Sequence, residues 1–220
     1  MPEIRDEWGP LASTIEDMHR RLDHRLGWRF LTCPAQNVGE ARVGLISINP
    51  GGQGFEPPVL TVEQGSAYEV EAWKQYPPGA EPLQLQVQLL LRLAGVAPGD
   101  ELSAYFVPFR SRDWASLKQK AASVAFGERL WTGILAHASV RTIFGVGKGV
   151  LGTKLSEMHG AQLYRTDPSG WGELTIDTYR ASDGRALILL PHLSRFRLFG
   201  RPGGIAEATV AAILKTVQVR

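Results

Sequence analysis

Residues 41–54, ARVGLISINPGGQG, form the stretch of sequence that decides the fold. Val43 to Ile48 is a short apolar run rich in β-branched residues, which predicts a buried strand. The run stops at Asn49-Pro50 and two glycines, because proline lacks a backbone donor and glycine permits positive φ. Ligands of parallel α/β sheets bind at the carboxyl ends of strands. Asn49 is therefore the first candidate functional residue; the alternative is an asparagine that only completes a turn.

The composition predicts one globular protein without disulfides. A chain of 220 residues with 44% hydrophobic and 21% charged residues fits one domain with a packed core. A net charge of +2 permits a polyanionic partner without requiring one. Cys33 is the only cysteine, which excludes a disulfide framework and a cysteine-rich metal site. The N-terminal residues do not resemble a signal peptide, and no apolar run could span a bilayer. We expect a monomeric, cytoplasmic or nucleoid-associated protein that does not bind membranes.

Apolar periodicity predicts helices that alternate with strands. The expected helices are 10–26, 82–95, 121–138, 150–158 and 203–217. The expected strands are 43–48, 102–109, 141–147 and 186–190, with a hairpin at 162–164 and 173–179. This alternation predicts a mainly parallel sheet covered by helices on both faces. Residues 52–79 follow no period and form a long loop with several aromatic residues. His19 and His24 lie off the apolar stripe of the first helix, so we expect them to be solvated.

Two strand ends carry uncommon polar chemistry, Asn49 after the first strand and His192 after the last. A parallel sheet places both at the same edge. Residues 192–201, HLSRFRLFGR, then interleave arginines with large apolar residues. One physical use of such a loop is a wedge, in which apolar side chains enter a base stack while arginines hold phosphates. The alternative is that Phe196 and Phe199 pack on the closing helix and the arginines face water.

Residues 147–152, GKGVLG, match the G-x-G-x-x-G pattern between a strand and a helix. The dinucleotide fingerprint normally follows the first strand, whereas this stretch follows a third strand. A tight turn with close helix packing is therefore the favoured interpretation. No His, Asp or Glu residues have the spacing of metal ligands, so we expect no metal.

Together these pieces resemble the uracil-DNA glycosylase superfamily over roughly residues 28–217. Residues 44–51, which end in Asn49-Pro50-Gly51, are similar to the Gly-Ile-Asn-Pro-Gly or Gly-Met-Asn-Pro-Gly motif of its mismatch-specific and single-strand-selective branches. Residues 192–194, His-Leu-Ser, resemble the second motif, His-Pro-Ser-Pro, without its prolines. The asparagine with which the family reads the base is missing from the second strand, where residues 103–106 are Ser-Ala-Tyr-Phe.

The resemblance implies a three-layer α/β/α sandwich with a mainly parallel central sheet. It implies one glycosylase-like domain over residues 1–220, with the N-terminal helix, 10–27, packed on it. The implied activity is hydrolysis of the N-glycosidic bond of uracil or another deaminated or damaged base, without metal or cofactor. The implied partner is single- or double-stranded DNA. Asn49 would position the attacking water and His192 would stabilise charge on the departing base.

The resemblance also implies the surroundings of these two residues. The expected base pocket consists of Ile48, Pro50, Gly51, Phe55, Tyr68 and Tyr105. The expected DNA-binding and wedge residues are Ser194, Arg195, Phe196, Arg197, Leu198 and Arg201. In this set Phe55 or Tyr68 would stack on the base, and Ser194 would bind a flanking phosphate. Leu198, with Phe196 or Phe199, would fill the gap left in the helix.

Two other functional hypotheses remain open. The missing asparagine and the degenerate second motif fit a protein of this fold that binds nucleic acid or nucleotides without catalysis. A third hypothesis is an enzyme that acts on small nucleotides and uses the turn at 147–152.

Overall fold

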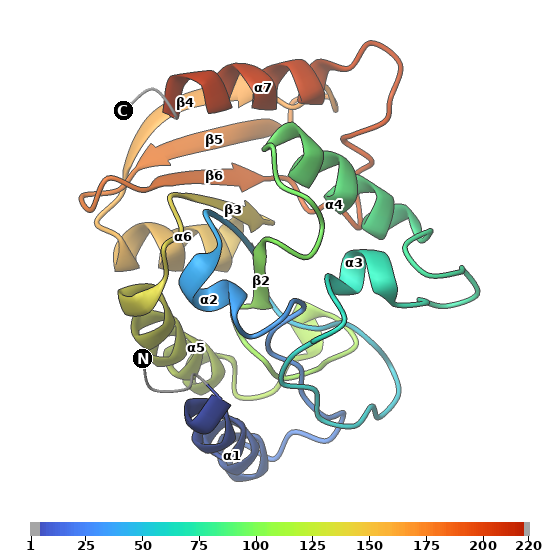
Figure 1. Cartoon of the computed structure of the whole chain (residues 1–220), viewed down its shortest axis with the longest axis vertical. Helices are drawn as coiled ribbons and strands as arrows, with labels where there is room; N and C mark the ends of the chain where they lie inside the picture. The colour runs from blue at the N-terminus through green and yellow to red at the C-terminus, as the bar shows by residue number, and fades with distance from the viewer. Residues whose placement is uncertain (1–4, 218–220) are drawn as a thin grey trace.

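The computed structural model describes residues 5–217, which form an α/β fold around a mixed, mainly parallel sheet (Figure 1). The strand order is β2-β1-β3-β6-β5-β4. The strands are β1 (Val43–Ser47), β2 (Leu102–Tyr105), β3 (Thr142–Val146), β4 (Gln162–Pro168), β5 (Thr175–Arg180) and β6 (Ala186–Leu190). The first four in that order are parallel, and β5 runs antiparallel to both of its neighbours. The predicted sheet is confirmed, including the hairpin that extends it.

The helices also follow the predicted alternation. They are α1 (Arg5–Arg21), α2 (Asn37–Glu40), α3 (Ala67–Val70), α4 (Pro82–Leu93), α5 (Lys120–His137), α6 (Gly149–Met158) and α7 (Ile205–Val217). Helix α4 begins with a capping box, in which the Glu81 side chain accepts from the Leu83 N–H and Gln84 accepts from the Glu81 N–H. The largest differences in length are that α1 covers Arg5–Arg21 instead of 10–26, that β2 ends at Tyr105 instead of 109, and that β4 extends to Pro168 instead of 164. The stretch 52–79, expected to be a loop throughout, contains the short helix α3.

Alternate residues of the strands enter two apolar cores, one on each face of the sheet. Ile46 of β1 belongs to the core that contains Ile15 of α1 and Leu130 of α5. Its neighbour Leu45 belongs to the core that contains Leu90 of α4 and further residues of α7. This alternation follows from the two-residue period of a strand. Burial of both faces explains why the strands are nearly continuous apolar runs.

Glycines allow α6 to lie close to the sheet. A Cβ atom at Gly145 or at Gly152 would lie 2.6 Å from a methyl carbon of Leu189 on β6. The side chain of Lys148, between these glycines, reaches β5 and bonds Thr175 and Asp177. Close packing on β6 therefore accounts for Gly152, whereas Gly147 and Gly149 have φ of 95° and 55°, a backbone conformation that favours glycine.

Helix α1 ends in a turn that directs His24 into the protein. The His24 N–H bonds the His19 carbonyl (3.1 Å), and Asp23 takes the left-handed conformation with φ 54°, which together form a Schellman motif. His24 then stacks on Phe109, with 4.4 Å between ring centroids, and its Nε2 lies 3.1 Å from the Ser123 hydroxyl. The expectation that His19 and His24 are solvated is therefore wrong, since both are less than 10% exposed. His19 is buried because it lies one turn after Ile15, on the buried face of α1. His24 is buried because α1 ends at Arg21 and the following turn directs the side chain inward.

Burial of His24 predicts a loss of stability on mild acidification. Desolvation, with a smaller contribution from His19, lowers the pKa of His24 to about 4 from its ordinary value of 6.5. Between these pH values the unfolded chain binds more protons than the folded chain. The stability that neutral His24 contributes is thus complete above pH 6.5 and falls as the pH drops towards 4, by up to about 1.4 kcal/mol per pH unit.

The measurement is the free energy of unfolding in urea at pH 7.5 and at pH 5. His24→Phe keeps the stack on Phe109. We expect the number of protons taken up on unfolding, which sets the pH dependence of the free energy of unfolding, to be lower by about one in this variant than in the wild type. Burial also lowers the pKa values of His19 and His159, so a weaker dependence of the same sign remains. Equal pH dependence in the variant and the wild type would contradict this role of His24.

Candidate active site at the carboxyl ends of the strands

The register of the parallel strands places Asn49 and His192 at the same level. Ser47 pairs with Val146, and Val146 pairs with Leu190, so the last residues of β1, β3 and β6 form one row. Asn49 and His192 each lie two residues beyond that row. Strand β3 separates them, and two strand spacings amount to about 10 Å. The two residues therefore lie at the same edge of the sheet, on either side of β3.

The side-chain amide of Asn49 is fixed through its nitrogen. Asn49 Nδ2 lies 2.8 Å from the Ser111 hydroxyl and 3.2 Å from each of the carbonyl oxygens of Phe109 and Pro50. These contacts show which amide atom is nitrogen and which is oxygen. The two carbonyl oxygens can only accept hydrogen bonds, and Oδ1 has no hydrogen to donate to them. Oδ1 accepts no hydrogen bond from residues 5–217. It is the atom of Asn49 that can accept one from a ligand or a water.

The chain that follows β2 holds the Asn49 loop in place. The pairing of the two chains continues beyond the strands, because the N–H groups of Phe106 and Val107 bond the Ser47 and Ile48 carbonyls at 2.7 and 2.8 Å. Further along, the Gly52 N–H bonds the Ser111 carbonyl at 3.0 Å. The loop therefore has a defined conformation without any ligand.

Arg110 also holds the Asn49 loop in place. Its guanidinium bonds the Gly51 carbonyl and the Glu56 carboxylate. A Cβ atom at Gly52 would lie 2.4 Å from that guanidinium. Gly52 also has φ +149°, a conformation that L side chains rarely adopt, so the backbone together with the close approach of Arg110 favours glycine at this position.

His192 presents a neutral ring whose proton lies on Nε2. Its Nδ1 accepts from the Ser194 backbone N–H (3.3 Å) and lies 2.8 Å from the Ser194 hydroxyl. Because a backbone N–H can only donate, Nδ1 is the unprotonated nitrogen and Nε2 carries the hydrogen. Desolvation, followed by the charge of Arg195, lowers the pKa of His192 below its ordinary value. At neutral pH this side chain is an uncharged hydrogen-bond donor through Nε2.

Gln86 of α4 determines which residues of the 192–201 loop are exposed. Its Nε2 donates to the Leu193 carbonyl, and its Oε1 accepts from the Leu198 N–H, both at 2.7 Å. Leu198 and Phe199 are consequently in the core, 2% and 1% exposed. This placement revises the expectation for Leu198, because a side chain anchored in the core does not project as a wedge. The half-buried and exposed loop residues are His192, Ser194, Arg195, Phe196, Arg197, Gly200 and Arg201.

Trp171 adds an exposed aromatic ring beside Phe196. It lies in the turn between β4 and β5, and the strand directions place that turn at the same edge as His192. The two rings are edge to face with centroids 5.9 Å apart, and the Arg201 guanidinium lies 4.4 Å from the Trp171 centroid. Trp171 is 36% exposed. Of the expected DNA-binding and wedge residues, half-buried Phe196 and exposed Arg201 therefore contact a tryptophan that the sequence pattern did not single out.

The structure distributes the expected base-pocket residues unevenly. Ile48 is half-buried, Pro50 is buried and Gly51 is exposed around Asn49, and Tyr105 ends β2 opposite Ser47. Phe55 is 67% exposed, whereas Tyr68 of α3 is 4% exposed. Burial raises the pKa values of Tyr68 and Tyr105, so both phenols are uncharged.

A partly buried ion pair lies near these two tyrosines. Arg29 forms a two-pronged hydrogen bond with Glu71, and the Trp73 indole donates to the same carboxylate at 2.8 Å. The Arg29 side chain is 10% exposed. Nothing in the local sequence around Arg29 indicates this position, which depends on the long loop folding back over the strand ends.

Compared with known proteins, the chain matches no family model and no curated protein sequence. Among residues 5–217, none of the helices combines the length and apolar character needed to cross a membrane. The same residues contain no group of three or more His, Cys, Asp or Glu side chains placed to hold a metal ion.

Gly147 supplies a direct test of how His192 is positioned. Gly147 has φ +95°, and a Cβ atom there would lie 3.3 Å from Cδ2 of His192. We expect Gly147→Ala to destabilise the fold by about 1–2 kcal/mol and to displace the imidazole. The control is Gly133→Ala on the exposed face of α5, which should stabilise by about 0.5–1 kcal/mol. Unfolding in urea gives the stability, and the NMR resonances of His192 report its position; unshifted resonances in Gly147→Ala would contradict the packing.

Proposed function

We propose that this protein is a monofunctional DNA glycosylase, built on a uracil-DNA glycosylase-like α/β/α sandwich, that hydrolyses the N-glycosidic bond of uracil or another deaminated or damaged base. The observation that carries the proposal is the pair formed by Asn49 and His192. One presents a free amide oxygen and the other a neutral N–H donor, at one level and on either side of β3.

In the proposed reaction Asn49 orients the water. Its Oδ1 accepts a hydrogen bond from a water molecule and directs the water oxygen to the anomeric carbon of the sugar. The carbon–oxygen bond forms as the bond to the base nitrogen breaks, the base leaves with the electron pair, and the proton lost by the water passes through solvent to the departed base. An amide is a weak base, so the reaction depends on departure of the base as a stabilised anion. Because Nδ2 is already bonded to three acceptors, the amide needs no reorganisation in the transition state.

His192 acts on the leaving group. Its Nε2–H donates to the carbonyl oxygen of the base on which negative charge develops. A neutral donor suits this role, since it stabilises the anion without first forming an ion pair that would have to be desolvated. The target nucleotide must leave the base stack to reach this edge, at a cost of a few kcal/mol. The exposed side chains of Arg195 and Arg197 are available to offset that cost through phosphate contacts, and the Trp171 ring, beside half-buried Phe196, through stacking.

Base release is the test of this function. The substrates are oligonucleotides that contain uracil, hypoxanthine or xanthine, each single- and double-stranded. We expect at least one to be cleaved, with a loss of about 10²-fold or more in Asn49→Ala and in His192→Ala. The control is His137→Ala, at the end of α5 shortly before β3 begins, which should retain full activity. If Asn49→Ala releases every base as fast as the wild type does, the proposed role of Asn49 is refuted.

A second candidate function is nucleic-acid binding without catalysis. It is favoured by the end of β2, where Tyr105 stands in place of an amide that could read a base edge. This function predicts salt-dependent DNA binding that weakens when Arg195 and Arg197 become glutamine. It also predicts that Asn49→Ala binds DNA normally and that no substrate loses its base. Fluorescence anisotropy with a labelled oligonucleotide at several salt concentrations, read beside the base-release panel, separates the two functions.

A further inference from the structure

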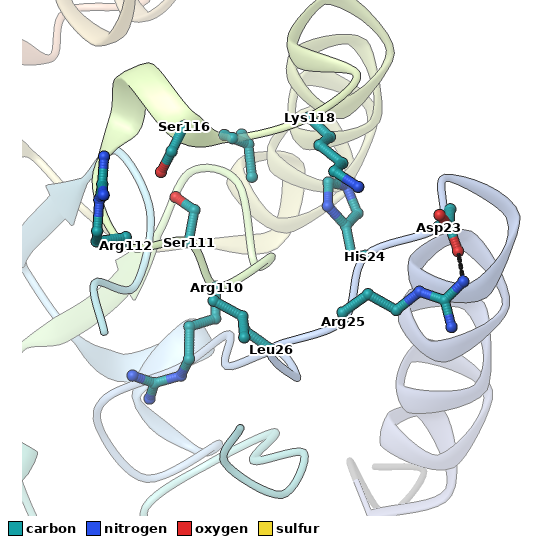
Figure 2. Close-up of a pocket in the computed structure, with 10 residues that line it drawn as sticks. Asp23, His24, Arg25, Leu26, Arg110, Ser111, Arg112, Ser116 and Lys118 are labelled. Atoms are coloured by element: carbon teal, nitrogen blue, oxygen red, sulfur yellow. Dashed lines mark ion pairs between the residues drawn. The ribbon is translucent and has the colours of Figure 1, made fainter. Parts of the chain in front are cut away.

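A basic pocket adjoins the Asn49 loop on the side away from His192. It has a volume of about 370 Å³ and lies between the residues that follow α1 and those that follow β2 (Figure 2). Four cationic side chains line it, against one carboxylate: Arg25, Arg110, Arg112, Lys118 and Asp23. Ser111, also in the lining, bonds Nδ2 of Asn49 at 2.8 Å. The pocket is thus one residue removed from the proposed catalytic amide.

The cations of the pocket differ in how firmly they are already paired. Arg110 is 8% exposed in its side chain and bonds Glu56, and Figure 2 shows its guanidinium turned away from the other lining residues. Arg25 and Arg112 form ion pairs with Asp23 and Asp113, but both arginine side chains are more than 60% exposed. Exposed pairs contribute at most about 1 kcal/mol, so a phosphate can replace the carboxylate.

Lys118 is the cation with the most freedom to bind a ligand. It has no carboxylate partner among residues 5–217, and Figure 2 shows its amine beside the His24 ring. His24 is neutral at pH 7, since burial lowers its pKa to about 4. The hydroxyls of Ser111 and Ser116 in the lining already donate to the Asp113 carbonyl, so the groups offered to a ligand are the ammonium and guanidinium groups. These cations are among the donors that recognise phosphate oxygens.

We propose that this pocket binds a backbone phosphate of the DNA strand that carries the target base, on the side of Asn49 opposite to Ser194. The proposal rests on the proposed glycosylase function and adds a second binding site for its DNA substrate. Ser111 follows β2 and Ser194 follows β6, which lie three strand spacings apart, about 14 Å. That span equals about four nucleotide rises of 3.4 Å along one strand. A strand held at both sites is fixed on either side of the nucleotide that leaves the stack.

The test compares DNA binding by the double variant Lys118→Gln/Arg112→Gln with binding by the wild-type protein. The probe is a labelled single-stranded 12-mer without an excisable base, so that binding is measured apart from chemistry. We expect the double variant to bind about three- to tenfold more weakly, and the slope of log K against log salt to fall by about 0.7 for each lost phosphate contact. The matched control is Lys215→Gln, an exposed lysine near the end of α7, which should behave as the wild type does.

The outcomes separate the pocket from the function on which it rests. If the wild-type protein binds the 12-mer and the double variant binds it with the same affinity and salt slope, the proposed phosphate site is refuted. The glycosylase proposal is unaffected by that result. A wild-type protein that neither binds the 12-mer nor releases any base contradicts both.

A second measurement distinguishes a backbone phosphate from a free nucleotide. Deoxythymidine 5′-monophosphate is titrated while the NMR resonances of His24 are followed. We expect those resonances to move only at nucleotide concentrations far above the 12-mer concentration that moves them. Equal potency of the mononucleotide would overturn the assignment to backbone phosphate and place a free nucleotide in the pocket.

Discussion

The hydrogen bonds that continue from β1 and β2 into the residues beyond them are the constraint on which the candidate site depends. A strand of five residues ends at Ser47, yet its chain remains bonded to the neighbouring chain as far as Gly52. Asn49 therefore lies on backbone that is as firmly held as the sheet itself. Precise placement of a polar side chain requires such support, because an amide on a free loop would sample many orientations. The Ser111 hydroxyl completes this support from the chain that follows β2.

Much of the fold was predictable because it follows from local periodicity. Strands such as β6 are apolar runs bounded by turn residues, and α4 carries its own proline, capping box and terminal glycine. The shared edge of Asn49 and His192 also followed, since it requires only that the strands be parallel. What could not be predicted depends on contacts between distant segments. Gln86 draws Leu198 into the core from more than a hundred residues away, and no pattern within the 192–201 loop reveals this contact.

The arginines show the same division between local pattern and tertiary contact. A net charge of +2 suggests little about charge distribution, and the sequence alone does not distinguish one arginine from another. In the folded protein the side chains of Arg29 and Arg110 hold the long loop in place through ion pairs with Glu71 and Glu56, respectively. Arg112, Arg195 and Arg197 are exposed along the edge that carries Asn49 and His192. The nearly neutral total thus conceals a local excess of positive charge, which is the quantity that matters for a polyanion.

Phe109 connects the N-terminal helix to the candidate site through its ring and its carbonyl group. Its ring stacks on His24 and on Phe126, while its carbonyl oxygen accepts a hydrogen bond from Asn49. A change in the size of any of these rings shifts the backbone that aims the amide. In an evolving lineage positions 24, 109 and 126 should therefore change together, because the three rings stack on one another. The packing of α1 is then inherited together with the position of Asn49, and a library that randomises position 24 alone would vary the orientation of that amide as well as the stability of the fold.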